Sequence, residues 1–377
     1  MPPQEPAMPS STLLASQNSS SESLDLMRND YIQGTAKKSS HTEYTREQLL
    51  SFAKCFTSDA VKASSRFFKA INFITAVPSI LIRYGILFPL RFFTLSASTI
   101  AFFMALPIGV TLKSSDIVVG YALKIASVLR LLILPCLFCV FQSLCVKYYC
   151  KGILFSLGVK VNYIGEKPQL NEPHVFVANH TSYLDYILLG AHKFPHAVVM
   201  ARHTGALGFL QNNGLNYLHS MCFDRANITE RKDLSESLKK HVKSPDTWKN
   251  PMIIFPEGTC VNNKYAIRFQ KGAFELGVKV CPVGIKYGRS FGDPYWDTRK
   301  GFMHYAYYRM TRWITTVDVV YCEPEVPRRG ETAVEYGERI KDRIATSIGL
   351  EKVDFNGMAK RDLLRVLNEE TAYKKNI

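Results

Sequence analysis

Hydrophobic and polar positions divide the chain into four segments of different character. Residues 1–42 are rich in Ser, Pro and Asn and show no apolar periodicity, which predicts a disordered tail. Residues 43–151 begin as a short amphipathic lead-in and then become strongly apolar. Residues 152–330 alternate strand-like runs with helix-like stripes, and residues 331–377 predict a C-terminal helical extension.

The apolar segment contains one run that is long enough to cross a membrane. Phe92 to Leu112 holds 21 residues without a charge, between Arg91 and Lys113, and about 20 apolar residues span a bilayer. Arg83 interrupts the run before it, and Leu131 to Val146 holds only 16 residues. Buried core helices are the alternative, but a soluble core helix rarely stays apolar on every face over this length. We therefore expect membrane-embedded helices with one or two spans.

The alternation after residue 152 predicts a layered α/β domain, in which a sheet is flanked by helices. Strands are expected at Val175–Ala178, Ala197–Met200, Met221–Phe223, Met252–Phe255 and Val278–Ile285, with Val317–Tyr321 as the last strand. Helices are expected at Ser182–His192 (capped by Thr181 or Ser182), Arg231–Lys243 and Phe269–Leu276, and over the stripe Tyr336, Ile340, Ile344 and Ile348. Pro282, within a strand-like run, indicates an edge strand or a bulge.

The net charge of +15 is unevenly placed. Residues 70–151 hold seven Lys and Arg against one acid, Asp116. Because these bases flank apolar runs and form no polar face with interleaved aromatic residues, they favour an anionic membrane surface over a nucleic acid. The nine scattered cysteines indicate a reduced, cytosol-facing protein. Cys136 and Cys139 form a C-x-x-C, but it lies in an apolar run with no second pair nearby, so it predicts no zinc site. His192, His196 and His203 predict none either, because Pro195 breaks the helix that would align the first pair.

The stretch VFVANHTSYLD, residues 175–185, places His180 where a buried strand ends and Asp185 on the first turn of a helix. Strand ends at the rim of an α/β sheet are where ligands bind. A carboxylate one helical turn later can hold one ring nitrogen and leave the other free as a general base. Since no activated nucleophile is evident, this pair would deprotonate a hydroxyl of the substrate itself.

Two further strand ends carry residues that suit an anion. In IIFPEGTCVNN, residues 253–263, Gly258 allows a ligand to approach the backbone, and Thr259 offers a hydroxyl and an N–H. MCFDR ends on Arg225, whose planar donors can bind two phosphate oxygens together. Cys260 has no base nearby in the sequence, which favours a packed thiol over a nucleophile.

These blocks, in this order, resemble the glycerolipid acyltransferase superfamily over roughly residues 150–330. RYGILFPLRFF, FPEGTCVNN, KGAFELG and IKYGRSFGDPYW resemble in particular its endoplasmic-reticulum glycerol-3-phosphate acyltransferases. The resemblance implies that His180 is the general base and that Asp185 orients it. Arg225, with Glu257 and Gly258, would shape the glycerol-phosphate site. It further implies transfer from acyl-CoA to the sn-1 hydroxyl of glycerol-3-phosphate, without a cofactor, giving lysophosphatidic acid at the endoplasmic-reticulum membrane.

Alternatives stay open at this point. A lysophosphatidate acyltransferase would use the same chemistry on a larger acceptor, and Tyr183, where relatives usually carry proline, puts the subgroup in doubt. A non-catalytic lipid-binding scaffold would keep the fold, but an altered His180 or Asp185 would then be expected.

Asn179 begins an N-x-T glycosylation sequon. Because a glycan there would block the histidine, we expect the domain to face the cytosol.

Overall fold

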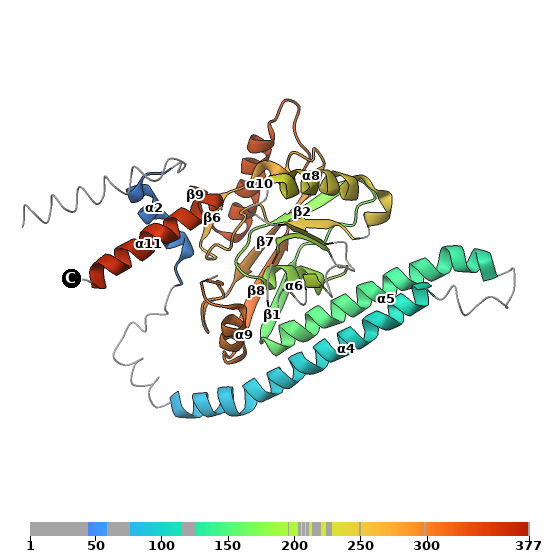
Figure 1. Cartoon of the computed structure of the whole chain (residues 1–377), viewed down its shortest axis with the longest axis horizontal. Coiled ribbons are helices and arrows are strands. Elements are labelled where there is room, and N and C mark those ends of the chain that lie inside the picture. Colours follow the sequence, from blue (N-terminus) through green and yellow to red (C-terminus); the bar gives the residue numbers. More distant parts are fainter. Residues whose placement is uncertain are drawn as a thin grey trace, which may run out of the picture. The chain divides into compact units, whose positions relative to one another are not determined.

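A computed structural model describes residues 44–58, 76–114, 126–194, 196–202, 205, 208, 211–212, 220–223, 228–248, 250–297 and 299–375 (Figure 1). Contacts divide the chain into two compact units, Phe52–Lys360 and the two chain ends, Met1–Ser51 with Arg361–Ile377. In the unit of the chain ends, Arg46 pairs with Glu369 and Glu370 at 3.4 and 2.8 Å. The predicted disordered tail lies outside the described residues.

A seven-stranded sheet forms the centre of the unit Phe52–Lys360, in the order β1-β8-β7-β2-β5-β3-β4. Its strands are β1 (Val159–Ile164), β2 (His174–Ala178), β3 (Ala197–Ala201), β4 (Met221–Phe223), β5 (Met252–Ile254), β7 (Lys279–Tyr287) and β8 (Thr315–Tyr321). Neighbouring strands are parallel, except that β7 and β8 pair antiparallel. A separate pair joins β6 (Tyr265–Arg268) to β9 (Glu351–Asn356).

Helices complete the layers around this sheet, so the predicted α/β fold is confirmed (Figure 1). They are α4 (Phe88–Ser114), α5 (Ala126–Ser156), α6 (Leu184–Gly190), α8 (Ile228–Lys243), α9 (Phe302–Met310) and α10 (Ala333–Ile348). The unit of the chain ends holds nearly all of α2 (Arg46–Phe52) and α11 (Lys360–Lys375). Short 3-10 turns occur at Ala53–Phe56, Pro245–Thr247, Lys271–Ala273 and Gly357–Ala359.

Strand β2 shows how the two faces are covered, because successive side chains of a strand point to opposite faces. Val175 and Val177 join one buried apolar cluster with residues of α8 and of the predicted stripe on α10. Phe176 instead meets the rings of Phe194 and His196. All five residues of β2 are buried, as expected for a parallel strand with both faces covered. Core packing on both faces therefore fixes the end of β2 at the edge of the sheet.

The apolar segment forms two long helices, α4 and α5, that pack against each other (Figure 1). Among the described residues, one stretch, Ala76–Ala105, is long and apolar enough to cross a membrane by length and composition. This stretch begins earlier than the predicted run Phe92–Leu112. Arg83 does not end the helix, because the backbone continues through it in π-helical turns and its Nε donates to the Ser79 carbonyl at 3.2 Å.

Arg91 fastens α4 to the rest of its unit. Its guanidinium is buried and donates through Nη1 to the carbonyls of Met310 (2.8 Å) and Arg312, and through Nη2 to the carbonyl of Trp313 (2.7 Å). A buried cation needs such partners, since an unpaired one would be strongly destabilising. The start of the long helix is thereby tied to the chain segment that follows α9.

Several expected elements differ from the structure. Helix α6 begins at Leu184, two residues after the predicted start at Ser182, and the Leu184 N–H donates to Ser182 Oγ at 3.2 Å, as the predicted Ser182 cap requires. Of the predicted helix Phe269–Leu276, only a 3-10 turn is present. Strands β1, β6 and β9 and helix α9 were not predicted. The last strand is β9 and not the predicted Val317–Tyr321.

Pro282 lies on β7, an interior strand between β2 and β8, so the edge prediction was wrong. The bulge prediction fits better. Val283 pairs with Tyr321 and Val280 with Glu325, so two residues on β7 face three on the opposite segment. The extra residue interrupts the ladder at Pro282, which has no N–H to contribute to it.

Candidate active site

The candidate site lies where β2 and β5 end. The two strands are parallel neighbours, so the loops that follow them leave the sheet at the same edge. The His180 N–H donates to Glu257 Oε2 at 2.7 Å, and the Val261 N–H donates to the His180 carbonyl at 2.8 Å. The loop with the histidine and the FPEGT loop are therefore held together as one structure.

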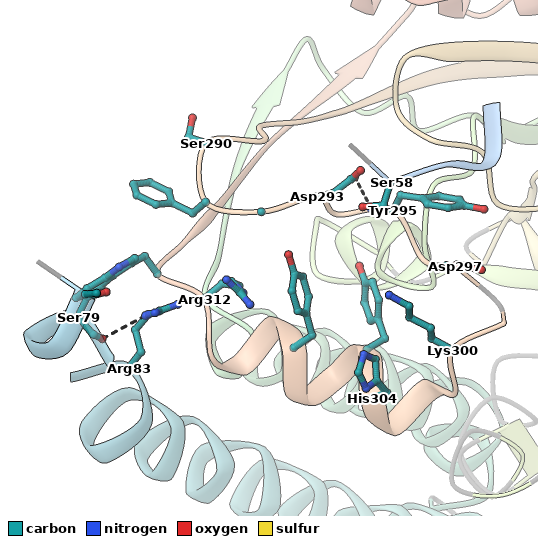
Figure 2. A pocket seen from close by; sticks show the side chains of 16 residues that line it. Ser58, Ser79, Arg83, Ser290, Asp293, Tyr295, Asp297, Lys300, His304 and Arg312 are labelled. Carbon is teal, nitrogen blue, oxygen red and sulfur yellow. Dashed lines mark hydrogen bonds between the residues drawn. The ribbon is translucent and has the colours of Figure 1, made fainter. Parts of the chain in front are cut away.

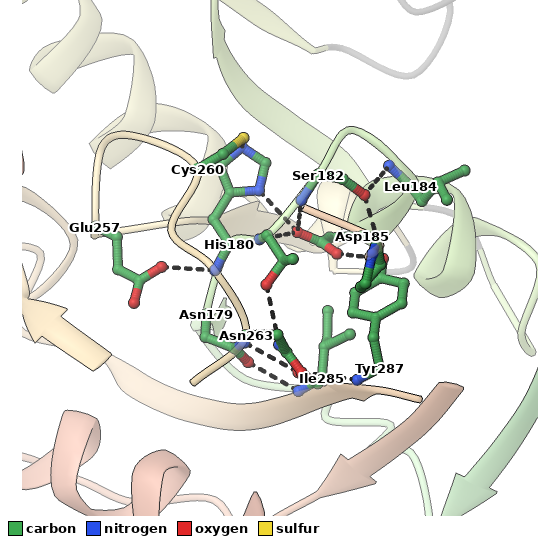
Figure 3. Close-up of polar contacts among 12 residues, drawn as sticks. Asn179, His180, Ser182, Leu184, Asp185, Glu257, Cys260, Asn263, Ile285 and Tyr287 are labelled. Carbon is green, nitrogen blue, oxygen red and sulfur yellow. Dashed lines mark hydrogen bonds and ion pairs between the residues drawn. The ribbon is translucent and has the colours of Figure 1, made fainter. Parts of the chain in front are cut away.

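Asp185 is the centre of this structure (Figure 3). Its side chain is fully buried, and its Oδ2 accepts hydrogen bonds from His180 Nδ1 (2.9 Å), the Thr181 N–H (2.6 Å) and the Ser182 N–H (2.9 Å). Its Oδ1 accepts one from the Tyr287 hydroxyl at 2.5 Å. These bonds satisfy a carboxylate that would otherwise be too costly to bury. The amide of Leu184 donates instead to Ser182 Oγ at 3.2 Å, which is the contact expected of a Ser182 cap.

The contact with Asp185 decides which nitrogen of His180 is available. Because Nδ1 donates its proton to the carboxylate, Nε2 carries the lone pair whenever the ring is neutral. The ring stacks on Phe255 with centroids 4.5 Å apart, and its side chain remains 22% exposed. A fixed, partly exposed imidazole of this kind can take a proton from a hydroxyl that approaches Nε2.

Cys260 lies against this nitrogen, with its Sγ 3.4 Å from His180 Nε2. The sequence showed no base near Cys260, and the structure supplies one from the other loop. Burial lowers the pKa of His180, but the neighbouring Cys260 sulfur and the Asp185 carboxylate raise it, to about 10 overall. Cys260 itself is only 3% exposed.

Glu257 acts on the backbone of this site. Its side chain is fully buried and its carboxyl accepts from the His180 N–H. Burial raises the pKa of Glu257 to about 8, although the hydrogen bond from His180 lowers it. Its observed contact is with the histidine loop, so any effect on substrate would pass through the position of His180.

Two buried asparagines tie the histidine loop to β7. The Asn179 amide accepts from the Ile285 N–H (2.8 Å) and donates to the Ile285 carbonyl (3.0 Å). The Asn263 amide donates to Thr181 Oγ1 (3.0 Å) and accepts from the Tyr287 N–H (2.7 Å). The asparagines of the NHTS and CVNN segments therefore serve to hold the backbone of the two loops against β7.

Lys360 reaches the site from the segment that follows β9, and the sequence did not single it out. Its buried ammonium donates to Thr259 Oγ1 (3.0 Å) and to the Cys260 carbonyl (3.1 Å), and lies 3.5 Å from the Tyr295 hydroxyl. The lysine therefore holds the loop that carries Cys260. No local pattern could have revealed it, since the contact spans about a hundred residues.

Gly357 brings the same segment against the FPEGT loop. A Cβ at this position would lie 2.3 Å from the Glu257 carbonyl oxygen and 3.2 Å from the Thr259 methyl group. Such a distance is far shorter than van der Waals contact, so a side chain here would push the loop away. Segment 351–360 is thus part of the site's support.

The predicted site residues have different outcomes. The structure brings His180 and Asp185 into contact and places Glu257 directly behind them. Gly258 has φ 68, a left-handed conformation that favours glycine. The Thr259 hydroxyl accepts from Lys360. Arg225 lies outside the described residues.

Other candidate ligands do not converge. Among the described residues, no group of three or more His, Cys, Asp or Glu side chains could hold a metal ion. His192 Nδ1 contacts the Tyr321 hydroxyl, and His196 Nδ1 contacts the Pro251 carbonyl. His203 lies outside the described residues.

Comparisons with known proteins agree with the motif order. Residues 160–286 match the family model described as Acyltransferase. Glycerol-3-phosphate acyltransferase 3 of Mus musculus is 35% identical over 213 residues, which cover 56% of this chain and 48% of the relative. The Homo sapiens protein of the same name is 33% identical over 226 residues (60% and 51%), and glycerol-3-phosphate acyltransferase 4 of Mus musculus is 34% identical over 220 residues (58% and 48%).

The chain spans about half the length of these curated relatives. Among solved structures, the 1-acyl-sn-glycerophosphate acyltransferase PlsC from Thermotoga maritima is similar, with 20% identity, a TM-score of 0.37 and coverage of 56% of this chain and 87% of that chain. The resemblance inferred from the sequence is confirmed by the family match and by these relatives.

The packing of Gly357 can be tested with a matched pair of glycine variants. Gly357→Ala forces the Glu257 carbonyl to move, and overpacking of this kind costs about 1–3 kcal/mol. Gly272→Ala is the control, because a Cβ there meets nothing within 4 Å. In detergent, the midpoint of thermal unfolding should fall by several degrees for Gly357→Ala and stay near wild type for Gly272→Ala. Equal midpoints would show that segment 351–360 does not press on the loop.

Proposed function

We propose that this chain, which carries an acyltransferase domain over residues 160–286, transfers a fatty acyl group from acyl-CoA to the sn-1 hydroxyl of glycerol-3-phosphate. The observation that carries the proposal is the His180–Asp185 pair at the sheet rim, with Nε2 turned away from the carboxylate. The names of the relatives supply the acceptor. The product is lysophosphatidic acid, an early intermediate of phospholipid and triacylglycerol synthesis.

The chemistry follows from the two nitrogens of His180. Nε2 takes the proton of the acceptor hydroxyl as its oxygen attacks the thioester carbon of acyl-CoA. The C–S bond then breaks, and the imidazolium returns the proton to the departing CoA sulfur. Asp185 fixes the ring and stabilises the imidazolium through its bond to Nδ1. The reaction uses only the two substrates, and His180 returns to its starting protonation state.

Cys260 suggests a second mechanism, in which the thiol attacks first and forms an acyl-enzyme. A Cys–His–Asp arrangement can do this. We favour direct attack by the acceptor, because the Cys260 side chain is almost fully buried whereas the His180 side chain is 22% exposed. A small hydroxyl can reach the imidazole more easily than a bulky thioester can reach Sγ.

The remaining alternatives differ in acceptor or in class. A lysophosphatidate acceptor would use the same pair of residues, and the deciding quantity is the ratio of kcat/KM for the two acceptors with one acyl-CoA. A non-catalytic scaffold would not need the Asp185 hydrogen bonds that fix one tautomer of His180. The intact pair therefore supports an enzyme.

We also place the domain on the cytosolic side of the endoplasmic-reticulum membrane. Stretch Ala76–Ala105 supports membrane attachment. Asn179 supports the orientation, because both polar atoms of its amide are bonded to Ile285 inside the core. A glycan on that nitrogen would break these bonds and block His180, so the sequon must stay unmodified.

Loss of the base should abolish transfer. His180→Ala should lower kcat by about 10²–10⁴-fold, the usual contribution of a general base. Asp185→Asn should also be severe, because an amide can offer the ring the wrong hydrogen-bond partner. Glu166→Gln, at a side chain that is 86% exposed, is the control and should keep wild-type activity. The assay uses labelled acyl-CoA and glycerol-3-phosphate; a His180→Ala enzyme with more than about a tenth of the wild-type rate would refute the mechanism.

Cys260→Ala should shift the pH dependence of the rate. The base must be neutral to act, so activity rises as pH passes the pKa of His180. Cys260 raises that pKa, and its removal should lower the pKa and move the rising limb of the profile toward lower pH. The measurement is kcat/KM against pH for wild type and variant. Complete loss of transfer at every pH would instead favour the acyl-enzyme mechanism.

Protease protection tests the orientation. In sealed microsomes, added protease should digest the acyltransferase domain, because a cytosolic domain is accessible from outside. Opening the vesicles with detergent serves as the control for total digestion. Full protection in sealed vesicles would place the domain in the lumen and contradict the proposal.

A further inference from the structure

A cavity of about 630 Å³ lies beside the candidate active site (Figure 2). Its walls come from the start of the Ala76–Ala105 stretch, from the loop that follows β7, and from α9 with the residues after it. His180 is not among its lining residues. Tyr295 is, and its hydroxyl lies 3.5 Å from Lys360, which in turn holds the Cys260 carbonyl. The cavity is therefore adjacent to the loop that contacts His180 Nε2.

Three cations line this cavity without a carboxylate partner among the described residues: Arg83, Lys300 and Arg312. Arg83 donates only to carbonyls, to Ser79 at 3.2 Å and Thr311 at 3.5 Å. Figure 2 shows Arg83 and Arg312 toward one end of the cavity and Lys300 toward the other. A positive charge that the protein does not neutralise is available for an anionic ligand.

Arg312 is the most informative of the three. Its guanidinium lies over the ring of Tyr308, 4.2 Å from the centroid, and its buried Nε has no hydrogen-bond partner in the part of the chain that the structure describes. Arg312 lines the cavity, and a guanidinium there that has an unsatisfied donor and no carboxylate partner among the described residues fits an anionic ligand. The carboxylates on the walls are engaged elsewhere: Asp297 pairs with Arg299 at 2.7 Å, and Asp293 lies 3.9 Å from Arg289.

The size and the apolar walls narrow the ligand class. Cavities of about 300–1,000 Å³ take ligands of drug size, and glycerol-3-phosphate would leave most of this one empty. Phe291 and Trp313 are partly exposed on the walls, and Tyr295, Tyr305 and Tyr308 add further ring surface. The walls thus suit a molecule that combines several phosphate groups with an aromatic or apolar body.

We propose that this cavity binds the coenzyme A part of the acyl donor, with its phosphate groups on Arg83, Lys300 and Arg312. The inference rests on the proposed function, in which acyl-CoA is the donor. It assigns the donor phosphates to a cavity of their own, apart from the acceptor's phosphate. An anionic lipid headgroup carries the same phosphate chemistry, but the link through Tyr295 and Lys360 toward His180 favours the substrate that delivers the thioester.

The test measures binding in the absence of transfer, with the full chain in detergent and His180→Ala in every variant. Calorimetry compares coenzyme A with 3′-dephospho-coenzyme A. Arg312→Gln and, separately, Lys300→Gln should each weaken coenzyme A binding about tenfold, since a hydrogen bond to a charged group is worth about that factor. At least one of the two variants should also reduce the preference for coenzyme A over the dephosphorylated form. Lys271→Gln, which removes an exposed cation paired with Glu275 and absent from the cavity lining, is the matched control and should bind as the parent does.

Two results would overturn the proposal. One is unchanged coenzyme A affinity in both folded variants. The other is a loss confined to phosphatidate-containing vesicles, relative to phosphatidylcholine vesicles, which would make the cavity a lipid site. Failure of the proposed function is a separate outcome, because it would appear as coenzyme A binding by the active protein without transfer to glycerol-3-phosphate.

Discussion

The burial of the Asp185 carboxylate is the constraint on which the site depends. A fully buried charge is tolerable only if donors surround it, and this one collects two backbone amides, the Tyr287 hydroxyl and His180 Nδ1. Satisfying it bends the chain after β2 into a tight turn, ties that turn to β7 and fixes one tautomer of the histidine. The same interactions that make the carboxylate tolerable therefore leave Nε2 as the available base.

The parts around this pair have distinct tasks. Glu257 accepts from the backbone N–H of His180, so the FPEGT loop positions the histidine. Lys360 and Gly357 hold that loop from behind, which makes a segment beyond the matched acyltransferase residues part of the support. Tyr295, whose hydroxyl lies near Lys360, lines the cavity that also contains Arg312. A rigid histidine next to the cavity that we propose for coenzyme A fits direct acyl transfer, which needs the reacting groups held in place.

Local patterns predicted much of this but could not predict contacts between distant segments. A strand, a polar turn and a helix around His180 follow from periodicity, as does the stripe on α10. Ser182 Oγ accepts from the Leu184 N–H, as the predicted cap would, although the helix begins two residues later than expected. The apolar stretch begins before the predicted run Phe92–Leu112 because the helix continues through Arg83 and Arg91, whose guanidinium groups donate to carbonyl oxygens. Cys260 and Lys360 were missed as partners because only the folded chain brings them to His180 and Thr259.

The most direct test of the central claim is a structure of the protein with glycerol-3-phosphate and a non-transferable acyl-CoA analogue. Direct attack predicts the sn-1 hydroxyl oxygen within about 2.6–3.2 Å of His180 Nε2, with the Asp185 bond to Nδ1 retained. The same crystals exposed to acyl-CoA alone should show no acyl group on Cys260. A hydroxyl bound away from Nε2, or an acyl group on Cys260 Sγ, would contradict the account.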